Sequence, residues 1–103
     1  MKETSHIEVT QSSGNVFTDL GFPPAEARNL QMRTEMMLAL KKFMVREGLT
    51  QAAAARRLKV TQPRISDLTR GKLSRFSLDT LVNMLTNAGL DVELRVRGGR
   101  KVA

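Results

Sequence analysis

The stretch from residue 50 to residue 72 constrains the fold more than any other part of the chain. It holds two short segments of helical composition, separated only by Lys59 and Val60. Thr50 and Thr61 stand directly before these segments, where a hydroxyl can accept hydrogen bonds from the free N–H groups of a first helical turn. Four consecutive alanines favour helix in the first segment and keep its surface thin. We therefore expect two short helices joined by a tight turn.

The apolar residues of this stretch have packing roles. Ala55 lies where the two helices would be in closest contact, and Val60 would fill the corner between them. Ile65 and Leu68 fall on the inner face of the second helix, and Gly71 is placed to end it. Two short helices connected in this way form a helix-turn-helix unit.

Further helices are expected on both sides of this unit. Pro23 and Pro24 can open a long helix, which Gly48 would end. A last helix is predicted between Ser77, as its cap, and Gly89, as its left-handed terminator. The expected apolar face of this last helix consists of Leu78, Leu81, Val82 and Leu85.

A single strand follows the last helix, because the apolar period changes from 3.6 to two. Over residues 91–97, apolar and charged residues alternate: the apolar ones are Val92, Leu94 and Val96. One strand leaves its backbone N–H and C=O groups unpaired. It must therefore pair with residues 7–9, with a copy of itself in a dimer, or with another protein.

The length and the apolar content set the size of the fold. The 103 residues, of which 41% are apolar, suffice for one domain with a modest core. We expect a mainly α-helical domain of about five helices with a short C-terminal strand. Residues 1–22 would form a partly flexible arm, residues 23–90 the helix-turn-helix domain, residues 91–97 the strand and residues 98–103 a tail.

The residue types present argue against several functions. Without cysteine there is no thiolate metal site, and the lone His6 cannot supply a histidine metal cluster or an ordinary catalytic triad. No paired nucleophile and base stands out, and no Gly-rich phosphate loop is present. We expect no enzyme, no metal and no cofactor. With neither a secretory signal nor a membrane-spanning stretch, the chain is expected to be a soluble, cytoplasmic protein.

Charge is distributed unevenly along the chain. Residues 1–27 carry one base against four acids, a net −3, whereas residues 28–103 carry 16 bases against six acids, a net +10. Within the basic part, residues 56–75 hold seven bases and one acid, a local +6. Such a cluster could face the phosphates of a nucleic acid, or it could be a solvated surface that keeps the protein soluble.

These residues resemble the Xre/Cro family of phage-repressor-like helix-turn-helix proteins, whose fold is lambda-repressor-like. The resemblance is carried by Gln51, Ala55, Val60, Thr61, Gln62, Ile65, Ser66, Leu68, Gly71 and Lys72. More narrowly, NVFTDLGFP at 15–23, GLTQ at 48–51 and GKLSRFSLDTL at 71–81 are similar to HigA-type antitoxins and related stand-alone regulators. One departure is Lys59, where the family usually has a left-handed glycine. The expected strain is ~1 kcal/mol.

The resemblance implies a reading surface on the second short helix. Its groove-facing residues would be Thr61, Gln62, Pro63, Arg64 and Asp67. Gln62 could bond an adenine edge, and Arg64 a guanine edge or a phosphate, each good base pairing being worth about 1–3 kcal/mol of discrimination. Pro63 replaces a usual polar residue and could still touch a thymine methyl. Alternatively these are ordinary exposed helix residues, and Asp67 only pairs with a neighbouring arginine.

Other side chains are expected to position the protein on the phosphate backbone without reading sequence. These candidates are Thr50, Gln51, Lys59, Arg70, Lys72 and Arg75. The resulting hypothesis is a sequence-specific repressor that binds double-stranded DNA as a homodimer through the strand or the last helix. The narrower resemblance implies that it is also an antitoxin, neutralising a small RelE-like toxin. The alternative is a protein-interaction module that keeps the fold without reading DNA.

Overall fold

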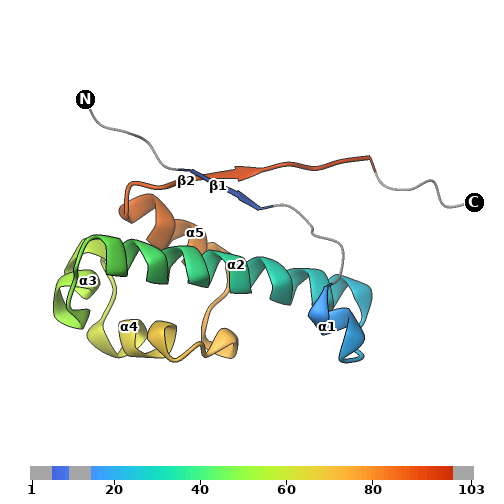
Figure 1. Cartoon of the computed structure of the whole chain (residues 1–103), viewed down its shortest axis with the longest axis horizontal. Coiled ribbons are helices and arrows are strands. Elements are labelled where there is room, and N and C mark those ends of the chain that lie inside the picture. Colours follow the sequence, from blue (N-terminus) through green and yellow to red (C-terminus); the bar gives the residue numbers. More distant parts are fainter. Residues whose placement is uncertain (1–5, 10–14, 99–103) are drawn as a thin grey trace, which may run out of the picture.

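The computed structural model describes residues 6–9 and 15–98 (Figure 1). In chain order, the elements are β1 (His6–Val9), α1 (Val16–Asp19), α2 (Pro24–Arg46), α3 (Gln51–Leu58), α4 (Gln62–Thr69), the 3-10 turn η1 (Leu73–Arg75), α5 (Leu78–Asn87) and β2 (Asp91–Leu94). The expected mainly helical fold with a C-terminal strand is confirmed. Parts of the expected arm, and the tail after Gly98, lie outside the described residues.

The 23-residue helix α2 is the element around which the others are arranged (Figure 1). Pro24 opens it, as predicted, and the chain leaves it at Gly48 in a left-handed conformation with φ of 62°. One side of α2 is buried in the core, and its buried residues in the second half of the helix are Met36, Met37, Leu40, Phe43 and Met44. From the other side of the core, α5 packs against α2. The core is therefore aliphatic and methionine-rich.

Helices α3 and α4 form the predicted helix-turn-helix pair. The Thr50 hydroxyl accepts a hydrogen bond from the Ala53 N–H at 3.1 Å, and the Thr61 hydroxyl accepts one from the Arg64 N–H at 3.3 Å. In the turn, Lys59 adopts φ 60° and ψ 44°. It is the one non-glycine residue with a positive φ in the described part of the chain. The left-handed turn expected at Lys59 is confirmed.

Helix α5 starts and ends where the sequence predicted. Ser77 caps it by accepting from the Thr80 N–H at 3.1 Å, and the Leu90 N–H returns to the Leu85 carbonyl at 3.0 Å beyond Gly89. The prediction that Val82 belongs to its apolar face was wrong, because this side chain is 38% exposed. The inner stripe runs instead through Leu81, Met84, Leu85 and Ala88. A residue directly after Leu81 is turned about 100° away from that stripe.

Strands β1 and β2 pair in parallel, with His6 opposite Asp91 and Val9 opposite Leu94. Of the three partners left open for the C-terminal strand, the structure thus shows the N-terminal segment. Parallel strands need a long crossover, and here the whole helical domain supplies it. The sheet lies along the side formed by α2 and α5, away from α4 (Figure 1). The strand ends at Leu94, earlier than the predicted 97.

Helix α1 was not predicted and lies within the stretch expected as an arm. The Asn15 side chain starts it by accepting from the Phe17 N–H at 2.8 Å. The same side chain donates to the Ala27 carbonyl at 3.1 Å, which ties α1 to the beginning of α2. Phe17 and Phe22 make an edge-to-face contact with ring centroids 6.1 Å apart. The motif at 15–23 therefore folds onto the helical domain.

Candidate nucleic-acid interface

The first turn of α4 presents three of the predicted reading residues together. Thr61, Gln62 and Pro63 are consecutive and all exposed. Pro63 fits in the first turn, where its missing N–H is not needed by the helix. Beneath them, Ile65 and Leu68 are fully buried and fix α4 on the core. This end of α4 therefore offers polar and apolar side chains on a rigid support.

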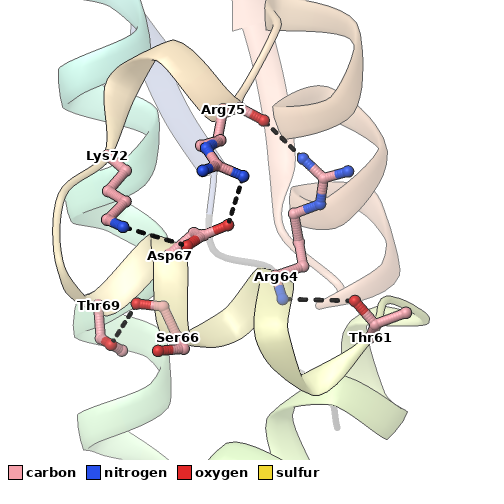
Figure 2. Close-up of polar contacts among 7 residues, drawn as sticks. All are labelled: Thr61, Arg64, Ser66, Asp67, Thr69, Lys72 and Arg75. Atoms are coloured by element: carbon pink, nitrogen blue, oxygen red, sulfur yellow. Dashed lines mark hydrogen bonds and ion pairs between the residues drawn. The ribbon is translucent and has the colours of Figure 1, made fainter.

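Arg64 is less free than its neighbours. Its Nη1 donates to the Arg75 carbonyl (Figure 2). Its guanidinium lies 5.5 Å from the centroid of the Phe76 ring. Phe76 is almost fully buried. Stacking on an aromatic face and a charge-assisted hydrogen bond hold the arginine head against the segment between η1 and α5. This hydrogen bond uses one of the five guanidinium N–H groups of Arg64.

Asp67 faces two cations. Its Oδ1 lies 4.0 Å from Nζ of Lys72, and its Oδ2 lies 3.9 Å from Nη1 of Arg75 (Figure 2). The carboxylate is half-buried, whereas Arg75 is largely exposed. Asp67 is thus placed to orient two of the predicted phosphate contacts. This geometry supports the alternative of an ion pair and does not test the predicted base-reading role.

The remaining predicted phosphate contacts lie on the elements that border α4. Thr50 and Gln51 are exposed at the start of α3, and Lys59 is exposed in the turn. Arg70 is exposed directly after α4. Of the two other cations in this part of the sequence, Arg57 stacks on the Phe43 ring at 5.2 Å. Basic and polar side chains therefore lie on the elements next to the exposed first turn of α4 and on the connection that follows this helix.

Three residues that support this site were missed by the sequence reasoning. From α2, the Nη1 of Arg33 donates to the carbonyls of Leu73 and Phe76 at 2.8 and 3.2 Å. Asn29 orients the same arginine by accepting from its Nε at 2.6 Å. Phe76, described above, is the ring under Arg64. No periodicity marks Arg33 as a supporting residue, because its carbonyl partners lie 40 and 43 positions away in the chain.

In residues 6–9 and 15–98, no group of three or more histidine, cysteine or carboxylate residues could hold a metal ion. Every buried side-chain nitrogen or oxygen of the described part has a hydrogen-bond partner. The described helices also include none that is both long enough and apolar enough to span a membrane.

Comparisons with known proteins agree with this geometry. Residues 16–97 match a family described as a helix-turn-helix domain. Among solved structures, a chain described as an XRE family transcriptional regulator is 37% identical, with a TM-score of 0.68. The similarity covers 79% of this chain and 92% of that one. No curated protein matches the chain.

Proposed function

The chain belongs to the helix-turn-helix domain family and is a DNA-binding transcription regulator, and we propose that it is a dimeric, cytoplasmic repressor that recognises a specific operator. The observation that carries the proposal is the exposed first turn of α4, where Gln62 and Pro63 project beside a basic surface. A helix that reads DNA enters the major groove with its N-terminal residues. The exposed turn is the corresponding end of α4.

We assign the reading roles within this turn by chemistry. The Gln62 amide matches the donor and acceptor of an adenine edge, and the Pro63 ring matches a thymine methyl. Thr61 keeps its hydroxyl hydrogen available, because it only accepts in the helix cap. Arg64 would contact a guanine or a phosphate, and Asp67 would act mainly by orienting Lys72 and Arg75.

Phosphate contacts would come from both sides of α4. Thr50, Gln51 and Lys59 belong to α3 and the turn, whereas Arg70, Lys72 and Arg75 belong to the connection to α5. Such contacts fix orientation and supply much of the affinity. Because one eight-residue helix reads only a few base pairs, two protomers on half-sites about 34 Å apart would provide the specificity.

The test is a fluorescence-anisotropy titration with the duplex upstream of the protein's own gene and with a scrambled duplex, each at two salt concentrations. We expect tight binding to the first duplex only. Gln62→Ala should weaken that binding by about 5- to 150-fold and leave binding to the scrambled duplex unchanged. Asn83→Ala, which removes an exposed amide from α5, is the matched control. Equal affinity for both duplexes in the wild type would refute a sequence-reading function.

A second candidate function, antitoxin activity, is supported by the acidic beginning of the chain and by the motif that forms α1. Residues 1–27 carry a net −3, a suitable charge for binding a small basic RelE-like ribonuclease. Co-expression with the product of an adjacent gene of that type should yield a co-purifying complex and relieve growth arrest. A genomic neighbourhood without any such gene would remove this candidate and leave the regulator intact.

A further inference from the structure

One face of α2 is open to solvent in its second half. Leu38 and Val45 lie on this face seven residues apart and are 48% and 82% exposed. Seven residues are close to two helical turns, so both side chains fall on one stripe. With Lys41, Lys42 and Arg46 they line a shallow depression. We call these five residues the α2 stripe.

The first half of the same face is covered by α1. Ala27 is eleven residues before Leu38, about three turns, and therefore lies on the line of the α2 stripe. It is fully buried, and its carbonyl accepts from the Asn15 side chain at the start of α1. The first half of this face is thus covered by a short helix of the same chain. Nothing in the described chain covers the continuation of the face over Leu38 and Val45.

The outer side of α1 is itself apolar and exposed. Val16 and Leu20, four residues apart, are 52% and 68% exposed. Asp19 lies between them in sequence and is also exposed. Residues four apart lie on one side of a helix, so the outer side of α1 combines two apolar side chains with one carboxylate. We call Val16, Asp19 and Leu20 the α1 patch.

The α1 patch and the α2 stripe are complementary in charge. Residues 15–27 contain two acids and no base, a net −2, and residues 38–46 contain three bases and no acid, a net +3. We propose that the α1 patch of one protomer packs on the α2 stripe of a second copy, and reciprocally. The two α2 helices then run antiparallel. This inference rests on the proposed dimeric regulator and identifies its interface.

A two-fold arrangement of this kind is the one that the charges favour. Pairing stripe with stripe would bring six cations together, and pairing patch with patch would bring carboxylates together. Reciprocal packing of each α1 patch on the α2 stripe of the other protomer instead joins each cationic stripe to an acidic patch. Because an isologous interface repeats every contact, the complementarity counts twice. Glu35, which lines a depression with Leu38, Lys42 and Arg46, already accepts a hydrogen bond from the Gln31 side chain at 2.9 Å.

Sedimentation velocity of the full chain without DNA, over a micromolar to millimolar series, measures the dimer dissociation constant. Val45→Glu should raise this constant by more than about tenfold, since the new carboxylate would face Asp19 of the second copy. Val82→Glu, which makes the same change at an exposed valine of α5, should leave it unchanged. Melting followed by circular dichroism checks that both variants are folded.

Charge reversal identifies the partner surfaces. Asp19→Lys alone and Lys42→Glu alone should each weaken the dimer, and the two together should restore it to within about threefold of the wild type. A monomeric wild type over the whole series, a dimer indifferent to Val45→Glu, or a doubly reversed variant that stays dissociated would each overturn the interface. Dissociation by Val96→Glu alone would place the contact on the exposed end of the C-terminal strand instead.

The proposed function and the interface fail in different experiments. Sedimentation contains no DNA, so loss of operator binding does not affect its outcome. If the interface holds and the operator titration shows no discrimination, the dimer stands and the reading function is rejected. If operator binding is specific and Val45→Glu does not change the dimer, the regulator stands and this interface is rejected.

Discussion

Lys59 holds the turn between α3 and α4 in a left-handed conformation that L-residues with a side chain adopt at a cost. The N–H of Val60 closes the end of α3 on the Ala55 carbonyl at 3.0 Å, so the turn is retained despite the strain. The sequence predicted this conformation from the family resemblance. The geometry of the turn requires a left-handed backbone at residue 59. Glycine would adopt this conformation with less strain than the lysine that is present.

We predict that Lys59→Gly stabilises the protein by about 0.5–1 kcal/mol, because relief of the left-handed strain exceeds the added entropy of the unfolded glycine. Urea denaturation followed by circular dichroism measures the change. Lys59→Ala keeps a Cβ atom and should give no such gain. Equal stabilities of the glycine and alanine variants would contradict the strain.

A substitution of Asp67 tests whether this side chain of α4 contacts DNA directly. Its carboxylate lies beside Lys72 and Arg75. We predict that Asp67→Asn raises affinity for a scrambled duplex, since one negative charge near the phosphates is removed, and changes unfolding free energy by less than about 1 kcal/mol. Competition titrations with single-base operator variants measure discrimination. A fall of about fivefold or more at one base pair would instead show that Asp67 reads that base.

At the scale of elements, the position of α4 depends on α2. Arg33 of α2 donates to the carbonyls of Leu73, the first residue of η1, and Phe76, which directly follows η1. Phe76 in turn lies under the guanidinium of Arg64. The long helix therefore fixes the connection after α4, and through it the side chains that face DNA.

We predict that Arg33→Met destabilises the fold by about 1–3 kcal/mol, because two carbonyls lose a charged donor. Operator affinity should fall as well, since the connection carries Lys72 and Arg75. Chemical denaturation and the anisotropy titration measure the two effects. Arg33→Lys should recover part of the stability. Wild-type stability in the methionine variant would show that the two carbonyls do not depend on this donor.

At the scale of the whole molecule, charge predicts how binding responds to salt. Four of the predicted phosphate contacts are cations, namely Lys59, Arg70, Lys72 and Arg75. Counterion release then gives a slope of log K against log salt of about −3.5 for one protomer and about −7 for two. Titrations at several salt concentrations measure it. A slope near −1 would show that most of these cations do not contact the DNA.

The pairing of the two strands also belongs to this scale. Strands β1 and β2 pair in parallel across a connection that contains every helix. The alternation of Val92 and Leu94 predicted a strand, but the three possible partners were equivalent from the sequence. Only the folded helical domain brings the two strands together, with β1 beside α2 and β2 beside α5.

What the sequence determined by itself is local. The caps at Thr50, Thr61 and Ser77 and the left-handed terminator Gly89 were predictable from the residues, because each depends on hydrogen bonds within about five residues. The left-handed conformation of Lys59 was implied by the family resemblance. The tertiary structure decided the contacts between distant residues. Those include the hydrogen bonds from Arg33 to the carbonyls of Leu73 and Phe76, the ring of Phe76 under Arg64, the docking of α1 and the parallel pairing of the strands. Their partners are set by how helices pack in three dimensions, and no spacing along the chain encodes that orientation.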